Sequence, residues 1–144
     1  MSEQNYANHR RFVPMYHYVA LALIIAALLG SLVNLYKAVK SGDGVYGASL
    51  IVVSTFILGI LYYYLRAFAL RAQDRLIRLE ENFRHYLMNG KLLDPKLTIR
   101  QIIGLRFASD GEFMQLEKRA AAENLSEDDI KKAIKNWKGD YYRV

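Results

Sequence analysis

Few side chains in this sequence have a type and spacing that could support catalysis or metal binding. The three histidines, His9, His17 and His85, are far apart, and none has an acidic or histidine partner at metal-ligand spacing. Asp110 and Glu112 resemble a carboxylate pair that could transfer protons. Both follow Ser109 at the expected start of a helix, where negative charge is favoured, so we interpret them as helix-capping residues.

Other motifs for chemistry are missing. The sequence has no cysteine, which excludes disulfides and thiolate chemistry. It contains no phosphate-binding glycine loop or nucleophile motif, and the segment 110–113, "DGEF", lacks the further oxygen ligands of a calcium loop. We therefore predict no catalytic residue, no metal site and no cofactor, and hence a protein that is not an enzyme.

Two long apolar segments dominate the first half of the chain. As a helix, residues 15–36 would extend roughly 33 Å, enough to cross a hydrocarbon core about 30 Å thick. Residues 47–65 contain no charged side chain, and a short polar link with glycines joins the two. We predict a transmembrane hairpin over 15–70 that follows an N-terminal tail over 1–14. A cleavable signal peptide is the disfavoured alternative, because the first segment is too long and lacks a cleavage pattern.

Basic residues near the two spans predict the orientation of the hairpin. Lys37 and Lys40 lie in the link, whereas six arginines flank the other ends of the spans: Arg10, Arg11, Arg66, Arg71, Arg75 and Arg78. Because Lys and Arg are enriched on the cytoplasmic side, we predict that both termini are cytoplasmic. Arg71, Arg75 and Arg78 form a basic line that we expect to contact anionic lipid headgroups.

Small residues predict how the spans pack. Ala22, Ala26 and Gly30 recur every four residues, and Thr55 and Gly59 are small residues of the second span. Such residues let two backbones approach closely, so we expect these five at the contact within the hairpin, although the same stripe would suit a dimer. Neither span contains Asp, Glu, Lys or Arg, which counts against a transporter or pump.

The second span has no stop signal before Asn89 and Gly90, so we predict one helix from about residue 48 to 88. Beyond Leu65 its apolar residues recur at steps of three and four, as in a heptad repeat: Ala69, Ala72, Leu76, Leu79, Phe83 and Tyr86. A stripe of this kind implies a covering helix. We expect the C-terminal helices of the same chain to cover it at Leu76, Leu79 and Phe83. A second copy of the chain is the alternative.

Residues 71–144 are predicted to form a cytoplasmic helical stalk and cap. Capping signatures at Thr98, Ser109 and Ser126 open three short helices, and we predict that the third runs to Trp137. Short helices bury little surface alone, so they need the long helix to complete a core. This region holds 15 of the 20 Lys and Arg and 12 of the 14 Asp and Glu, so its charges nearly balance. No helix presents the side chains that read base edges, and we predict no nucleic-acid binding.

The predicted fold is that of an all-α membrane protein. It has a two-helix transmembrane hairpin whose second span continues as a long cytoplasmic helix, packed by three short C-terminal helices. Four segments, "NHRRFVPMYH", "LRAQDRLIRLEENFRH", "LTIRQIIGLRFASDGEF" and "IKKAIKNW", resemble a family of small two-span bacterial membrane proteins of unknown function. RAQDR and LRFASD are the most specific parts. The resemblance implies a bacterial inner-membrane location and a cytoplasmic helical C-terminal region, but no activity.

An anchor, a projecting helix and no catalytic motif favour a non-enzymatic scaffold or accessory subunit of a larger inner-membrane assembly. Such a protein would present a cytoplasmic helical docking surface, either for another copy of itself or for a membrane protein complex. The alternative is a homo-oligomeric pore lined by the second span through Ser54, Thr55 and Gly59. A more distant alternative is a lipid-sensing tether.

Overall fold

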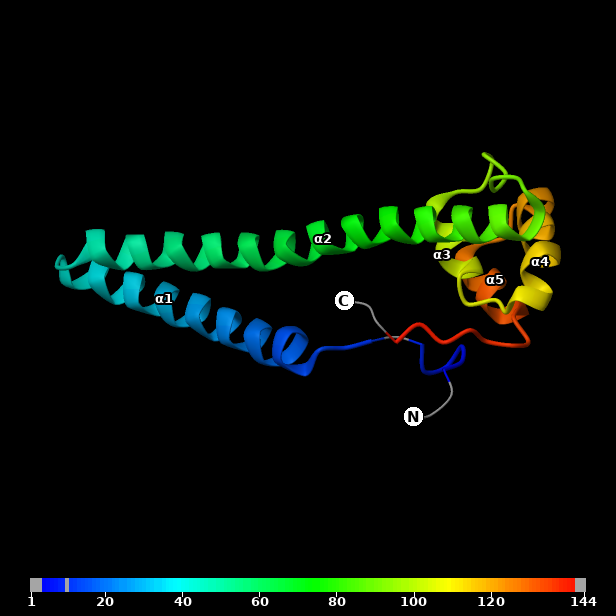
Figure 1. The fold of residues 1–144 in the computed structure, drawn as a ribbon. Coiled ribbons are helices and arrows are strands. Elements are labelled where there is room, and N and C mark those ends of the chain that lie inside the picture. Colours follow the sequence, from blue (N-terminus) through cyan, green and yellow to red (C-terminus); the bar gives the residue numbers. More distant parts are fainter. Residues whose placement is uncertain (1–3, 10, 142–144) are drawn as a thin grey trace. The chain divides into compact units, whose positions relative to one another are not determined.

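The regular structure of this chain is helical. A computed structural model describes residues 4–9 and 11–141. A short π-helix, Met15–Ala20, leads into α1 (Leu21–Ser41), which is followed by α2 (Val45–Asn89), α3 (Ile99–Leu105), α4 (Asp110–Glu123) and α5 (Glu127–Ala133) (Figure 1). Within the described ranges there is no strand, and one isolated antiparallel bridge joins Ala108 to Trp137. The predicted all-α class is therefore confirmed.

Helix α2 is continuous from the apolar part of the sequence into the charged part, over 45 residues. Glycines with positive φ stand at the ends of the helices. Gly42 (φ 74°) ends α1, and Gly90 (φ 71°) follows α2. A left-handed residue at this place is most favourable for glycine, which has no Cβ. The Gly90 N–H donates to the Tyr86 carbonyl at 2.7 Å, so the predicted stop signal ends the helix as expected.

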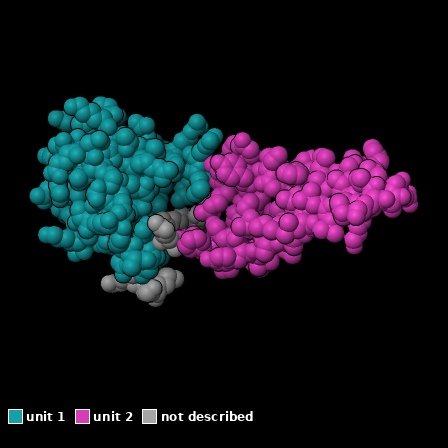
Figure 2. Space-filling view, turned by 180° about the vertical axis from the view of Figure 1, so that it is seen from behind, with its two compact units in different colours: residues 1–10, 69–144 teal, residues 11–68 magenta. Residues whose placement is uncertain are grey.

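The chain divides into two compact units, and α2 contributes to both (Figure 2). Residues 11–68 form the first, called here the hairpin unit, which contains α1 and the start of α2. Residues 1–10 and 69–144 form the second, called here the cap unit, of which residues 4–9 and 69–141 are described. Part of the predicted N-terminal tail thus belongs with the C-terminal helices.

Within the hairpin unit, α1 and the π-helix before it meet α2 through polar pairs. The hydroxyl oxygens of Ser31 and Thr55 lie 3.3 Å apart, and both side chains are buried. The rings of Tyr16 and Tyr62 stack with centroids 4.4 Å apart, and each hydroxyl donates to the other residue's carbonyl oxygen. Because each buried hydroxyl has a partner, these contacts avoid the cost of an unsatisfied polar group.

The expected small-residue contact needs a correction. Ala22, Ala26 and Gly30 are exposed on α1, whereas Thr55 is buried and Gly59 is half-buried on α2. Neighbouring residues on a helix point about 100° apart, so facing α2 with Ser31 turns the Gly30 line away. Ser31 can sit at the contact because its hydroxyl also donates to the Leu28 carbonyl at 2.8 Å. The spans therefore meet through hydroxyl groups rather than through the alanine stripe.

The core of the cap unit lies among α3, α4 and α5. Its largest fully buried side chains are Phe107, Phe113, Ile102, Leu105 and Ile130. Thr98 and Gln101 form the predicted capping box at the start of α3. The buried Gln101 amide also donates to the Leu125 carbonyl at 2.9 Å, which ties the start of α3 to the loop before α5.

The end of the chain departs from the predicted third helix, which was expected to run to Trp137. Helix α5 ends at Ala133, and the chain becomes extended at Ile134. The Lys138 N–H then donates to the Phe107 carbonyl at 2.7 Å, and the Ser109 N–H donates to the Asn136 carbonyl at 3.0 Å. Backbone pairing with the segment before α4 replaces the helical hydrogen bonds that α5 would otherwise continue.

The Glu112 carboxylate stabilises this backbone pairing, so we expect the stability of the cap unit to depend on pH. Its carboxylate accepts the backbone N–H groups of Lys135 and Asn136 at 3.1 and 2.9 Å. Partial burial opposes ionisation, but these bonds and those from Ser109 outweigh it and lower the pKa of Glu112. A lowered acid pKa stabilises the fold above its unfolded value, and this stability is lost as pH falls through the folded pKa.

We therefore expect Glu112→Gln to destabilise the cap unit at neutral pH and to flatten its acid sensitivity. The measurement is denaturant unfolding of the full chain at pH 7 and pH 3.5, followed by the fluorescence of Trp137, the single tryptophan. The exposed Glu123, at the end of α4, is the matched control as Glu123→Gln. An unchanged acid slope for Glu112→Gln would contradict this role.

Gly104 marks the closest approach of α3 and α5. A Cβ added there would lie 3.1 Å from both the Glu127 carbonyl oxygen and the Ile130 Cγ2 atom. We expect Gly104→Val to lower the free energy of unfolding by about 1–3 kcal/mol through overpacking. Gly111→Val is the control, because a Cβ at Gly111 has no neighbour within 4 Å among the described residues. Equal stability of the two variants in denaturant would refute the close approach.

Candidate docking surface on helix α2

One side of α2 holds the cap, and its residues are not those of the predicted stripe. Ile77, Glu81 and His85 are 5%, 5% and 4% exposed, respectively. They are spaced four residues apart and so share one face of the helix. His85 Nδ1 lies 2.7 Å from the Lys91 carbonyl oxygen, and the Asn82 side chain accepts the Leu93 N–H at 3.2 Å. This face anchors the loop that follows α2.

Arg84 makes the strongest polar link between α2 and α4. Its guanidinium bonds to Glu81 at 3.0 Å, to Asp110 at 2.5 Å and to the Ala108 carbonyl at 2.7 Å. It also lies over the Phe113 ring, 4.3 Å from the centroid. Its Nε and Nη2 groups both donate to the same Asp110 oxygen, Oδ1, and charge-assisted bonds are stronger than neutral ones. Arg84 therefore orients α4 against α2.

Within this network, the buried Glu81 carboxylate is unfavourable for folding when it is charged. Burial raises the pKa of its carboxyl group, and the charge and hydrogen bond of Arg84 offset only part of that rise. An isolated buried carboxylate is strongly unfavourable. The Arg84 guanidinium is consequently what keeps an acidic side chain tolerable at this interface.

The opposite side of α2 is uncovered. Leu76, Leu79 and Phe83 are 54%, 66% and 61% exposed, respectively. Ala72 and Tyr86, which continue the heptad steps, are exposed too. We call these five residues the α2 stripe. A line of exposed large apolar side chains on one helix face is typical of an interaction surface.

The prediction that Leu76, Leu79 and Phe83 form the contact between stalk and cap is therefore wrong. The cap packs on the face of Ile77, Glu81 and His85. An apolar stripe indicates only which helix face is poor in polar groups. The contact between α2 and the cap is instead held by hydrogen bonds of Arg84 and His85 to carbonyl groups of the cap unit. The partners of Arg84 lie up to 26 residues away in the sequence.

The three arginines expected to contact lipid are exposed. Arg71, Arg75 and Arg78 lie on the cap-unit part of α2, close in sequence to its hairpin part. Asp110, which we interpreted as a capping residue, lies in the first turn of α4 and also pairs with Arg84. Sequence reasoning missed this role. The available signal was that Glu81 and Arg84, three residues apart, share one helix face with the apolar residues Ile77 and Met88.

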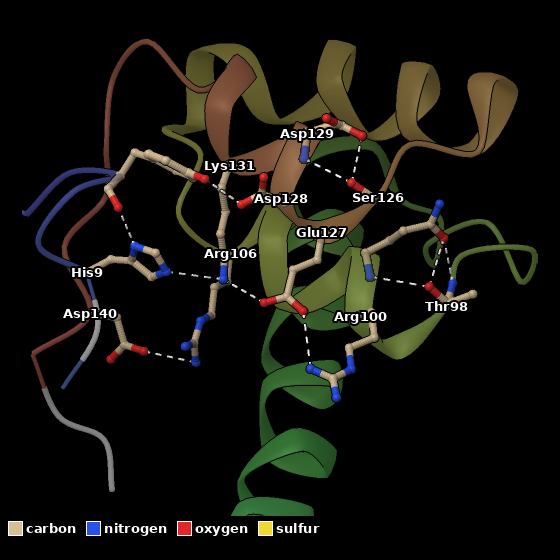
Figure 3. Close-up of polar contacts among 12 residues, drawn as sticks. His9, Thr98, Arg100, Arg106, Ser126, Glu127, Asp128, Asp129, Lys131 and Asp140 are labelled. Atoms are coloured by element: carbon tan, nitrogen blue, oxygen red, sulfur yellow. Dashed lines mark hydrogen bonds and ion pairs between the residues drawn. The ribbon is translucent and has the colours of Figure 1, made fainter. Parts of the chain in front are cut away.

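A second cluster joins the N-terminal residues 4–9 to α5 (Figure 3). The Tyr6 hydroxyl donates to Asp128 at 2.6 Å. Lys131 Nζ lies 3.4 Å from His9 Nε2 and 2.5 Å from Glu127. The Lys131 ammonium group therefore lies between the Glu127 carboxylate and the His9 imidazole and contacts both. Among the described residues, no three His, Asp or Glu side chains are arranged to hold a metal ion.

Comparison with known proteins adds a family but no activity. A model of a family of unknown function, designated DUF6526, matches residues 1–144. The resemblance to a family of unknown function is thereby confirmed. No curated protein and no solved structure matches the chain.

Proposed function

Since the chain belongs to this family of unknown function, we propose from its structure that it is a non-enzymatic membrane scaffold. In this role it is a scaffold or accessory subunit of a larger inner-membrane assembly. The observation that carries the proposal is the α2 stripe, which leaves Leu76, Leu79 and Phe83 uncovered on a helix whose other face holds the cap. The stripe is the docking surface, and the cap keeps its helix ordered.

The apolar surface of the hairpin unit supports membrane insertion. Two helices, Met15–Ser41 and Val45–Asn89, are long and apolar enough to cross a membrane. Only 6% and 17% of their most apolar windows are buried, whereas an apolar core helix of a soluble protein would be mostly buried. Lipid would cover the side chains that the chain itself leaves exposed, at no cost in unsatisfied polar groups.

The proposed location is the bacterial inner membrane, with both termini in the cytoplasm. The excess of arginine outside the link between the spans supports this orientation, and the family resemblance supports the location. Arg71, Arg75 and Arg78 would then face anionic headgroups, at about 1 kcal/mol each. On this proposal, α2 carries its stripe into the cytoplasm.

Single cysteines test the topology, because the chain has none of its own. In intact bacterial cells, an impermeant maleimide should label Asp43→Cys, in the link, and should label Leu92→Cys only after lysis. Both positions are exposed. Labelling of Leu92→Cys in intact cells would refute the orientation, and extraction of the protein by alkaline carbonate would refute insertion.

The scaffold role has its own test. Gentle detergent extracts of the native membrane, separated by blue-native electrophoresis, should contain the chain in a complex larger than a monomer. Alanine at Leu76, Leu79 and Phe83 together should release the monomer, whereas alanine at the exposed Leu92 should not. A wild-type chain that migrates only as a monomer would end the proposal.

The contacts of the second span do not support the pore alternative. Thr55, expected to line it, is buried at the contact with α1 and bonds to Ser31. The Ser54 hydroxyl donates to the Leu50 carbonyl of its own helix at 2.8 Å. No observation favours a pore, and we do not propose one.

A further inference from the structure

The α2 stripe has the pattern of one strand of a two-stranded coiled coil. Leu76 and Phe83 occupy position a of a heptad, and Ala72, Leu79 and Tyr86 occupy position d. Two helices with this repeat bury a and d residues of each in holes on the other. A second copy of the same helix meets that requirement, because its own stripe is identical.

The cap leaves this side of α2 free. Ile77 and Arg84 are at position b, His85 is at c and Glu81 is at f, on the face opposite a and d, whereas the Asn82 contact with the Leu93 N–H is at the flanking position g. All the residues that hold the cap, and the stripe itself, belong to the cap unit. A second helix can therefore pair with the stripe without displacing α3, α4 or α5.

The charges beside the stripe select the partner and its direction. Arg75 precedes Leu76 and is at position g, and Glu80 follows Leu79 and is at position e. Both are exposed, and among the residues that the structure describes neither takes part in an ion pair. In a parallel pair, g of one helix faces e five residues further along the other, so Arg75 faces Glu80 twice by symmetry.

Antiparallel pairing gives no such match. There, g residues face g and e residues face e. Position g holds Arg75 and Asn82, and position e holds Gln73, Glu80 and Leu87, so no opposite charges meet. The flanking charges thus favour the parallel arrangement alone.

We propose that α2 pairs in parallel with α2 of a second copy through the α2 stripe, with Arg75 of each copy bonded to Glu80 of the other. In the pair, Arg71 and Arg78, both at position c, remain for the lipid headgroups. This inference rests on the proposed membrane scaffold. The stripe covers fewer than three heptads, too few for a stable coiled coil in dilute solution. Insertion in one membrane would hold two copies parallel and raise their effective concentration.

Cysteine crosslinking of the full chain in its native membrane tests the pairing. Leu79→Cys, at position d, should form a disulfide-linked dimer under mild oxidation. Arg78→Cys, one residue away at position c and also exposed, is the matched control and should remain monomeric. Unchanged Trp137 fluorescence shows that each variant keeps its cap.

Charge reversal tests the direction of the pair. In the Leu79→Cys background, Arg75→Glu or Glu80→Arg places like charges together and should weaken association about fivefold, the scale of two exposed ion pairs. The two reversals combined restore opposite charges and should restore crosslinking. This rescue pattern separates a paired interface from a general loss of folding.

Several results would overturn the inference. One is equal crosslinking at positions 78 and 79, and another is the absence of rescue by the combined charge reversal. A third is a cysteine at position 79 that does not crosslink and that thiol reagents fail to reach only when the protein is in lipid vesicles. The last result would place the stripe on the lipid surface. Carbonate extraction and blue-native electrophoresis of the same samples separate the two proposals. An embedded chain that migrates in a larger complex without the Leu79→Cys crosslink ends the pairing but leaves the scaffold, whereas an extracted chain ends both.

Discussion

Replacing Arg84 with methionine should cost the cap unit about 3–5 kcal/mol of unfolding free energy, because a buried charge loses its partner. The guanidinium is nearly buried and bonds to Glu81, Asp110 and the Ala108 carbonyl. Methionine fills similar space but leaves the Glu81 carboxylate unpaired. The measurement is denaturant unfolding of the full chain in detergent, followed by the fluorescence of Trp137.

The exposed Arg78, on the same helix, provides the matched control, since Arg78→Met should change stability by less than about 0.5 kcal/mol. The Arg84 deficit should also depend on pH. Burial raises the folded pKa of Glu81, so the charged form is disfavoured and stability is lost as pH rises through that pKa. The deficit of Arg84→Met should therefore shrink as Glu81 becomes protonated at acidic pH.

A second substitution tests whether the loss arises from Glu81. Adding Glu81→Leu to Arg84→Met removes the unpaired carboxylate and should recover most of the lost stability, since a buried ion pair is often replaceable by apolar residues. If the double variant were less stable than Arg84→Met alone, the buried carboxylate would not be the cause of the deficit.

Phe113→Ala should destabilise the cap unit by a similar amount, about 3–5 kcal/mol, because it leaves a cavity in the core. Phe113 is fully buried and its ring faces Arg84 and His85 of α2. Loss of the ring removes both core volume and the surface on which the Arg84 guanidinium rests. Denaturant unfolding with Trp137 as the reporter again measures the change.

The matched control for Phe113 is Leu92→Ala, because Leu92 is a large apolar residue that is 67% exposed. Its loss should be small. A double-mutant cycle with Arg84→Met should show a coupling of about 0.5–2 kcal/mol between guanidinium and ring. Additive effects would indicate that Phe113 acts only through packing.

The helices of this chain were largely predictable because their signals are local. Two apolar runs, the glycine at Gly90 and the capping pair of Thr98 and Gln101 each act within a few residues of sequence. The continuous helix from the apolar run into the charged segment followed from the same local signals, since no proline or glycine interrupts α2 between Gly59 and Gly90.

The packing faces were not predictable in the same way. Ser31 and Ile77 each lie next to a residue that the apolar or small-residue pattern selected, and a shift by one residue turns a helix by about 100°. What decides the face is a set of polar partners: Thr55 for Ser31, and Asp110 and the Ala108 carbonyl for Arg84. Sequence spacing does not reveal such distant partners.

Thiol labelling along α2 tests most directly which face of this helix carries the cap. Single cysteines at 76, 77, 79, 81, 83 and 85 would be labelled in the full chain, in detergent and at a dilution where light scattering shows a monomer. We predict fast labelling at 76, 79 and 83 and slow labelling at 77, 81 and 85. The reverse pattern, with 76, 79 and 83 protected in the monomer, would contradict both the cap contact and the free stripe.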